Sequence, residues 1–180
     1  MGGYYYFVST LPFPLFGQKP GISFKHFMEL ARIHLAGPDF NELNFFHQAD
    51  PAEALKKVLN ASARRYLEFD IALRNRLAEL RAGKLKADAE KYKRSGIIDT
   101  AAMRTARQAF DETNPQKAAE ILLRAGYDFL SDLEVWHSFD IDVVLLFSMR
   151  LKITEERSRF DAVRGRESFE HELARALEKQ

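Results

Sequence analysis

The sequence of 180 residues contains no cysteine, which excludes disulfide bonds, thiolate catalysis and cysteine-based zinc sites. It also lacks an excess of charge of one sign, because it has 27 basic and 26 acidic residues and a net charge of +1. A nucleic-acid-binding protein normally carries a concentrated basic surface, and this balance argues against that class.

Long apolar runs are missing as well. The longest one, residues 143–147, falls far short of the roughly 20 apolar residues that cross a bilayer as a helix. The first residues are aromatic and interrupted by prolines, unlike the basic and aliphatic segments of a signal peptide. These absences predict a soluble, intracellular protein.

The motifs of common catalytic and metal sites are also absent. Residues 171–175, HELAR, begin like the helix of a zinc protease, but Arg175 stands where the second histidine ligand is required. No glycine-rich phosphate loop and no G-x-S-x-G turn occurs. The neighbouring carboxylates Asp140 and Asp142 lie on a charged helix, where such groups are normally solvated. We therefore expect no catalytic residue, no cofactor and no metal.

The histidines support the same expectation. No two of them have the i, i+4 spacing at which a helix offers two ligands to one ion. His26 and His34 are eight residues apart, about 12 Å along a helix, which is too far to share a metal. We expect all five to be ordinary surface or core residues.

What the sequence does contain is a repeated helical pattern, with a capping residue followed by apolar residues at helical spacing. The pattern predicts an all-α fold, a multi-helix bundle with one long central helix and a short extended N-terminal arm. The expected helices and their starts are 24–35 after Ser23, 40–47 after Asp39, 101–110, 115–136 after Asn114 with Pro115 first, 141–163 after Asp140, and a last helix from about Ser168 with Phe169, Leu173, Ala176 and Leu177 inward. Gly37 and Pro38 are expected to end the first of these helices. In the helix 115–136 we expect Trp136 on the inward face and Gly126 at a close helix crossing.

The longest uninterrupted stretch runs from Asp50 to about residue 85. Asp50 is a predicted N-cap, Pro51 occupies the first helical position and Glu53 the third, as in a capping box. No proline or glycine follows until Gly83, so we expect one helix of about thirty residues. Its apolar seam has one acidic member, Asp70, which has to be paired if it is buried. The seam suggests a coiled coil, but the other predicted helices carry enough apolar residues to cover it within one chain.

The second half of this stretch is basic on one side and includes Arg74, Arg76 and Arg81. One interpretation is an ordinary solvated helix face, in which nearby acidic residues pair with part of the charge. The other is a docking face for an acidic partner surface or for phosphate groups. Both interpretations stay open from the sequence.

The N-terminus predicts a different structure. Residues 4–9 are aromatic and β-branched, which favours a strand or an extended segment, and the prolines and glycines that follow exclude a helix after it. We expect residues 1–22 to be an extended aromatic arm and residues 23–180 to be one helical domain, with sub-bundles at 23–95 and 100–180. Tyr4, Tyr5 and Tyr6 either pack across the helices or form an exposed aromatic surface for a partner.

Three stretches together resemble one bacterial family. They are the aromatic opening with its Ser-Phe helix start (residues 4–35), the arginine-rich LRNRLAELRAGKL (73–85), and the helix that starts at Asn-Pro joined to HSFDIDVVLLFSMRLKITEER (137–157). The chain resembles, over almost its whole length, the family DUF2764, which is associated with bacterial V-type (V/A-type) ATPase gene clusters.

The resemblance implies a helical protein similar in role to the C (or d) subunit, the socket between the central stalk and the membrane rotor ring. We expect a non-enzymatic component or accessory of a V-type ATPase, located in the cytoplasm, peripheral to the membrane through the complex, and monomeric outside it. Its expected partners are subunits of the stalk or rotor ring, docked by Arg74, Arg76 and Arg81, with Tyr4, Tyr5 and Tyr6 as second candidates. The main alternative is a free-standing helical scaffold or regulatory protein that dimerises through the long helix, and an enzyme with an unrecognised polar pocket comes third.

Overall fold

A computed structural model of the chain describes residues 4–94 and 97–160. Over this part the chain forms α-helices and one short 3-10 helix (η1), without a strand, so the all-α prediction is confirmed for these residues. The elements are α1 (Tyr5–Thr10), α2 (Phe24–His34), α3 (Gly37–Phe46), α4 (Pro51–Lys57), α5 (Ala61–Leu85), η1 (Ala89–Tyr92), α6 (Thr100–Asp111), α7 (Pro115–Glu134) and α8 (Ile141–Ser158). The predicted last helix and the HELAR motif lie outside the described residues.

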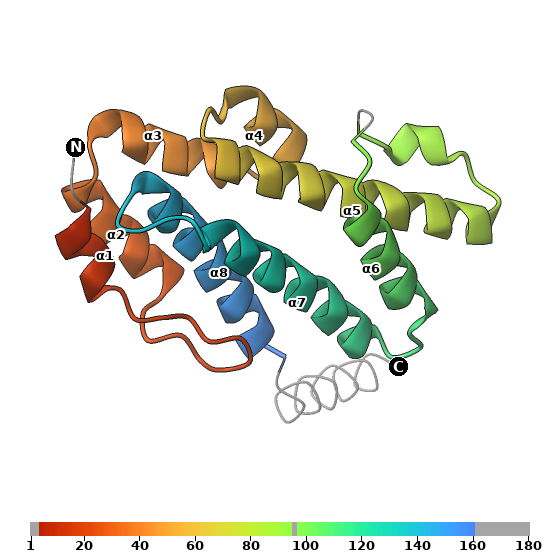
Figure 1. The fold of residues 1–180 in the computed structure, drawn as a ribbon. Helices are drawn as coiled ribbons and strands as arrows, with labels where there is room; N and C mark the ends of the chain where they lie inside the picture. The colour runs from red at the N-terminus through yellow and green to blue at the C-terminus, as the bar shows by residue number, and fades with distance from the viewer. Residues whose placement is uncertain (1–3, 95–96, 161–180) are drawn as a thin grey trace, which may run out of the picture.

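Helix α5 is the longest helix within the described ranges. Figure 1 shows α5 along one side of the molecule, α7 and α8 side by side at an angle to it, and α6 between α5 and α7 at one end. Helices α1 and α2 lie at the opposite end, next to the connection between α7 and α8 (Figure 1). Helix α5 contacts α4, α6, α7 and α8, so helices of the same chain cover it on several sides.

Two groups of buried apolar side chains hold this arrangement together. The larger one draws on α1 to α5, α7 and α8, and includes Phe27, Leu43, Leu130 and Leu145. The smaller one joins α5 to α6 through Phe69, Ala72, Leu73, Leu77, Ala102 and Ala106. The described part of the seam on α5 is therefore largely buried inside the chain.

Four predicted helix starts are confirmed, and at each of them the side chain of the N-cap residue accepts a nearby backbone amide. The side chain of Ser23 accepts from the amide of His26, Asp50 from Ala52, Asn114 from Gln116, and Asp140 from Val143. The reciprocal bond of a capping box is not seen at Asp50, because Glu53 lies 2.6 Å from Lys56 on the surface instead.

The prediction of one helix from Asp50 to residue 85 is wrong. The chain leaves helical geometry at residues 58–60, between α4 and α5. A carboxylate oxygen of Glu42 accepts the backbone N–H groups of Leu59 and Asn60, each at 2.6 Å, and the Asn60 side chain caps α5. On the other side of the break, the guanidinium of Arg64 donates to the carbonyls of Leu55 and Val58, which end α4. The backbone groups freed by the break are thus satisfied by side chains, which makes it stable.

The prediction of an extended segment at residues 4–9 is also wrong, because Tyr5–Thr10 forms α1. No side chain caps this helix. Its only buried residue is Phe7, whose ring stacks 5.9 Å from Phe27 and 5.1 Å from His34 of α2. Tertiary packing therefore overrides the local preference of an aromatic and β-branched segment.

A third correction concerns the turn after α2. Gly37 and Pro38, expected to end that helix, form the first turn of α3, and Asp39 lies within this turn instead of capping it. Proline fits a first helical turn because its missing N–H would have no intrahelical partner there.

Gly126 marks the close helix crossing that its position in α7 predicts. A Cβ atom at this position would lie 3.3 Å from Cδ1 of Ile153 in α8 and 3.4 Å from the hydroxyl of Tyr66 in α5. The absence of a side chain therefore lets three helices meet at one point.

In the described part of the chain, none of the helices combines the length and the apolar character needed to cross a membrane.

Candidate protein-docking surface

The loop between α7 and α8, residues 135–140, presents large apolar side chains to solvent. Trp136, the single tryptophan of the chain, is 91% exposed, and Val135 beside it is 68% exposed. The sequence pattern places Trp136 on the inner face of α7, and this prediction is wrong. Helix α7 ends at Glu134, so the helical spacing that would turn the indole inward no longer applies two residues later.

Phe139 in the same loop joins these residues to α1. Its backbone φ is +56°, a left-handed conformation that is strained for a bulky side chain, and its ring is 43% exposed. The ring lies 4.5 Å, centroid to centroid, from that of Tyr5, which is 63% exposed in α1. Tyr6 follows with 70% exposure. We call Tyr5, Tyr6, Val135, Trp136 and Phe139 the aromatic surface.

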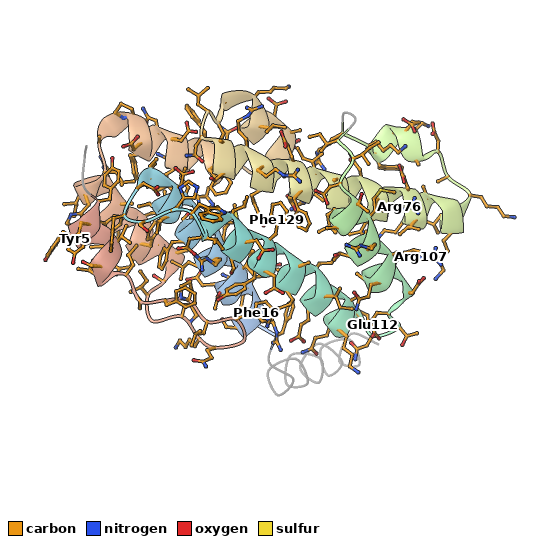
Figure 2. The ribbon with its side chains drawn as sticks, in the orientation of Figure 1. Tyr5, Phe16, Arg76, Arg107, Glu112 and Phe129 are labelled. Carbon is orange, nitrogen blue, oxygen red and sulfur yellow. The ribbon has the colours of Figure 1, made fainter. Side chains whose placement is uncertain are left out.

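The aromatic surface lies at one end of the molecule. Figure 2 shows Tyr5 at this end and Arg76 and Arg107 near the other. Backbone strain at a surface residue is common at binding sites, where the surrounding structure holds it in place. The loop has such a support in a cluster of polar side chains around His137.

His137 ties the loop to two helices. Its Nδ1 lies 2.9 Å from a carboxylate oxygen of Asp140, and its Nε2 lies 3.2 Å from the hydroxyl of Ser62 in α5. The other carboxylate oxygen of Asp140 accepts the amide of Val143 and caps α8. Burial alone would raise the pKa of Asp140, but the hydrogen bonds from His137 and from the Val143 amide outweigh it and hold the pKa below its usual value.

These side chains are also the nearest approach to a metal-ligand set in the described residues. Ligand atoms of His137, Asp140 and Asp142 lie within 4.8 Å of one another. However, both oxygens of Asp140 already accept hydrogen bonds, and both ring nitrogens of His137 face a hydroxyl or a carboxylate. These hydrogen bonds tie the loop to α5 and to the start of α8.

The three predicted tyrosines have different environments. The hydroxyl of Tyr4 donates to the carboxylate of Asp39, and its ring packs against the larger core. Burial, followed by this hydrogen bond, raises the pKa of Tyr4 above its ordinary value. Tyr5 and Tyr6 are the exposed members, so the two interpretations of the aromatic opening apply to different residues of it.

The three predicted arginines also differ in their surroundings. Arg74 lies 2.8 Å from Asp70, which gives that seam carboxylate its partner, and Arg76 lies 2.8 Å from Glu79. Arg81 has no carboxylate within 4 Å among the described residues. Arg74 and Arg81 line a cleft between α5, α7 and α8, which does not include Arg76.

Sequence reasoning did not identify Trp136 and Phe139 as surface residues. A signal was available, because a cap predicted at Asp140 leaves the residues just before it in a connection, where they need no inward-facing spacing. Comparison with protein-family models, with curated proteins and with solved structures found no match to this chain.

Proposed function

We propose that the chain is a non-enzymatic helical adaptor that docks onto other proteins through the aromatic surface. We propose further that its partners are V-type ATPase subunits of the central stalk or rotor ring. In this role it is a component or accessory of the complex, similar to the C/d subunit, cytoplasmic and peripheral to the membrane.

The observation that supports docking is the exposure of Trp136, in the same loop as Phe139, whose ring is in tilted contact with that of Tyr5. Exposed aromatic side chains that gather at one place are typical of interaction sites, and tryptophan and tyrosine are the residues whose truncation most often costs 2 kcal/mol or more of binding energy. The His137 cluster holds the loop in one conformation, so less entropy is lost when a partner binds.

The choice of an ATPase rests on the resemblance to DUF2764. Tyr5 and Tyr6 belong to the first stretch that carries it, and Trp136 and Phe139 belong to the third. The residues of the aromatic surface therefore come mostly from the segments that suggest this partner. Of the predicted arginines, Arg81 is the one whose charge stays available for a partner within the described structure.

A free-standing scaffold or regulatory protein is the second candidate, because the same aromatic surface can also bind a second copy of the chain. The seam on α5 is an unsuitable dimer contact, since Ala63, Tyr66, Leu73 and Leu77 are already buried within the chain. Light scattering at micromolar concentration separates the candidates: the adaptor proposal expects a monomer, and the dimer expects twice that mass.

The proposal is tested by a pull-down from the native membranes of the source organism with the full chain as bait. Stalk or rotor-ring subunits of the V-type ATPase are the expected proteins. A folded bait that recovers none of them, at a loading that recovers a known subunit pair, contradicts the ATPase proposal.

A further inference from the structure

The loop that carries Trp136 belongs to an acidic stretch of the chain. Residues 125–149 contain no lysine and no arginine. They contain five acidic residues: Asp128, Asp132, Glu134, Asp140 and Asp142. The chain as a whole is balanced, with a net charge of +1, so negative charge is concentrated in the part of the sequence that contributes Trp136 to the aromatic surface.

Arginines from outside this stretch compensate two of the five carboxylates. Asp128 lies 2.9 Å from Arg124, one turn earlier in α7. Glu134 pairs with Arg150 of α8. The other three carboxylates have no lysine or arginine within 4 Å among the described residues.

These three carboxylates make the surroundings of Trp136 negative. Asp140 and Asp142 share the imidazole of His137, at 2.9 and 3.6 Å. Asp132 is exposed and has no ion-pair partner within the described ranges. Three carboxylates against at most one imidazolium leave a net negative charge at this side of the aromatic surface.

The end of α7 adds to the negative potential. The last carbonyl groups of a helix carry a partial negative charge, which favours cations in the last turn. Helices α2, α4, α5 and α8 each have a basic side chain there. Helix α7 has none, and Asp132 and Glu134 lie close to its end instead. Because Arg150 compensates Glu134, the charge of Asp132 is the one that remains for a group from outside the chain.

Cations of the neighbouring helices do not cancel this potential. Helix α1 contains no charged residue. In α5, Arg64 donates to two backbone carbonyls and Arg65 pairs with Asp99 at 2.9 Å. Arg32 is exposed in the last turn of α2, on the α1 side of the surface. The aromatic surface therefore has an acidic side at the loop between α7 and α8.

Trp136 and Asp132 are placed so that one side chain of a partner can contact both. Val135 keeps helical backbone angles after the end of α7, so Trp136 follows Asp132 by about one helical turn, or 5.4 Å along the axis. A guanidinium stacks on an indole ring and forms paired hydrogen bonds with a carboxylate. In the described structure no cation lies over the indole, which is 91% exposed.

We propose that the partner segment which docks on the aromatic surface is basic, and that one of its arginines stacks on Trp136 and pairs with Asp132. Apolar side chains of the same segment cover Tyr5 and Phe139. This inference rests on the proposed docking function, because it names the chemistry of the partner. It does not depend on whether that partner is an ATPase subunit.

The fluorescence of Trp136 gives a direct test, because it is the single tryptophan of the chain. The probes are two short synthetic peptides without tryptophan or tyrosine. They share leucines at helical spacing, and one has arginine where the other has glutamate. We expect the arginine peptide to shift the Trp136 emission to shorter wavelength and to bind at least tenfold more tightly than the glutamate peptide. Its binding should weaken as salt is added, because exposed charges are screened. Equal affinities, or an affinity independent of salt, overturn the proposal.

A charge reversal beside Trp136 tests the site. Asp132→Lys with Ser138→Lys changes two exposed positions outside both the aromatic surface and the hydrogen bonds of His137. Lysine near the end of α7 favours the helix, so the variant is expected to unfold at an unchanged or higher temperature. It should bind the arginine peptide at least tenfold more weakly than the unsubstituted chain.

The matched control places the same change of charge at the other end of the molecule. Glu112→Lys with Thr113→Lys is expected to keep the affinity within twofold, and Figure 2 shows Glu112 far from Tyr5. An equal loss in the control and in the Asp132→Lys variant overturns the proposal, because net charge and not the site would then govern binding.

The same variants separate this inference from the proposed function in the pull-down from native membranes. If Trp136→Ser loses the ATPase subunits and the variant with Asp132→Lys and Ser138→Lys keeps them, docking stands and the basic partner is wrong. If the arginine peptide binds the unsubstituted chain and not this variant, while no ATPase subunit is recovered, the basic partner stands and the ATPase is wrong.

Discussion

The ring of Tyr5 in α1 lies 4.5 Å from the ring of Phe139 in the loop between α7 and α8. Two segments far apart in the sequence therefore build one exposed surface. The loop segment contains backbone strain, because Phe139 adopts a left-handed conformation. We expect Phe139→Gly to release about 1–3 kcal/mol of strain and to lose about 0.5–1.5 kcal/mol of ring contact. Stability should stay within about 2 kcal/mol of the unsubstituted chain in urea unfolding, while partner recovery falls. A loss of stability above 3 kcal/mol would show that the loop is mainly a structural element.

The ion pair between the buried Arg150 and the partly exposed Glu134 supports the start of the same loop. The Arg150 side chain is almost fully buried, pairs with the carboxylate of Glu134 and lies over the ring of Phe13. Glu134→Ala is expected to cost about 3–5 kcal/mol in urea unfolding, because it leaves a buried cation without its partner. Arg150→Met together with Glu134→Leu should recover most of this loss. If the double variant is as unstable as Glu134→Ala, packing around the arginine and not its charge explains the loss.

Gly126 and Gly83 form a matched pair for measuring the three-helix crossing. A Cβ at Gly83 in α5 meets nothing within 4 Å, so Gly83→Ala should stabilise the chain by up to about 1 kcal/mol through helix propensity. The same gain at Gly126 is opposed by the contacts at 3.3 and 3.4 Å with Ile153 and Tyr66. We expect Gly126→Ala to be nearly neutral and Gly126→Val to destabilise by about 1–3 kcal/mol in thermal unfolding. Equal gains for the two alanine variants would contradict a tight crossing.

His47 predicts a loss of stability in acid. Burial, and then the positive charge of Lys152, lower its pKa from 6.5 to about 3. Between these two values the unfolded state binds a proton that the folded state does not, so stability is complete above pH 6.5 and falls as the pH falls toward 3. The slope is at most about 1.4 kcal/mol per pH unit, or roughly 2 kcal/mol between pH 6 and 4.5.

Urea unfolding at several pH values checks this prediction. His47→Gln should remove this part of the pH dependence, whereas His26→Gln, at an exposed position beside Glu29, should keep it. An unchanged slope in His47→Gln would mean that other groups cause the acid sensitivity.

The features that the sequence predicts correctly depend on neighbouring residues. The caps at Ser23, Asp50, Asn114 and Asp140 each act on an amide two or three residues away, so a short pattern is sufficient to find them. The glycine in α7 is a different case, because its crossing involves the distant residues Ile153 and Tyr66, and Gly83 in α5 meets nothing within 4 Å although it is also a helical glycine.

The features that it misses depend on distant residues. The break before α5 needs Glu42, which accepts amides from residues 59 and 60, and α1 needs the rings of α2. The aromatic surface requires a loop and a helix from opposite ends of the described chain to meet. The helix and strand preferences of a short sequence segment carry no information about these long-range contacts. The fold class could therefore be predicted from the sequence, and the aromatic surface could not.

The central claim is that the aromatic surface binds V-type ATPase subunits, and the most direct measurement compares two baits from the same membranes. Trp136→Ser removes the most exposed aromatic side chain of the surface, and Leu85→Ser changes an exposed apolar residue at the far end of α5. We predict that Trp136→Ser reduces the recovery of stalk or rotor-ring subunits at least tenfold, a loss of about 1.4 kcal/mol or more, while Leu85→Ser keeps recovery within twofold of the unsubstituted chain. Equal recovery with both baits, or no ATPase subunit with the unsubstituted chain, would contradict the account.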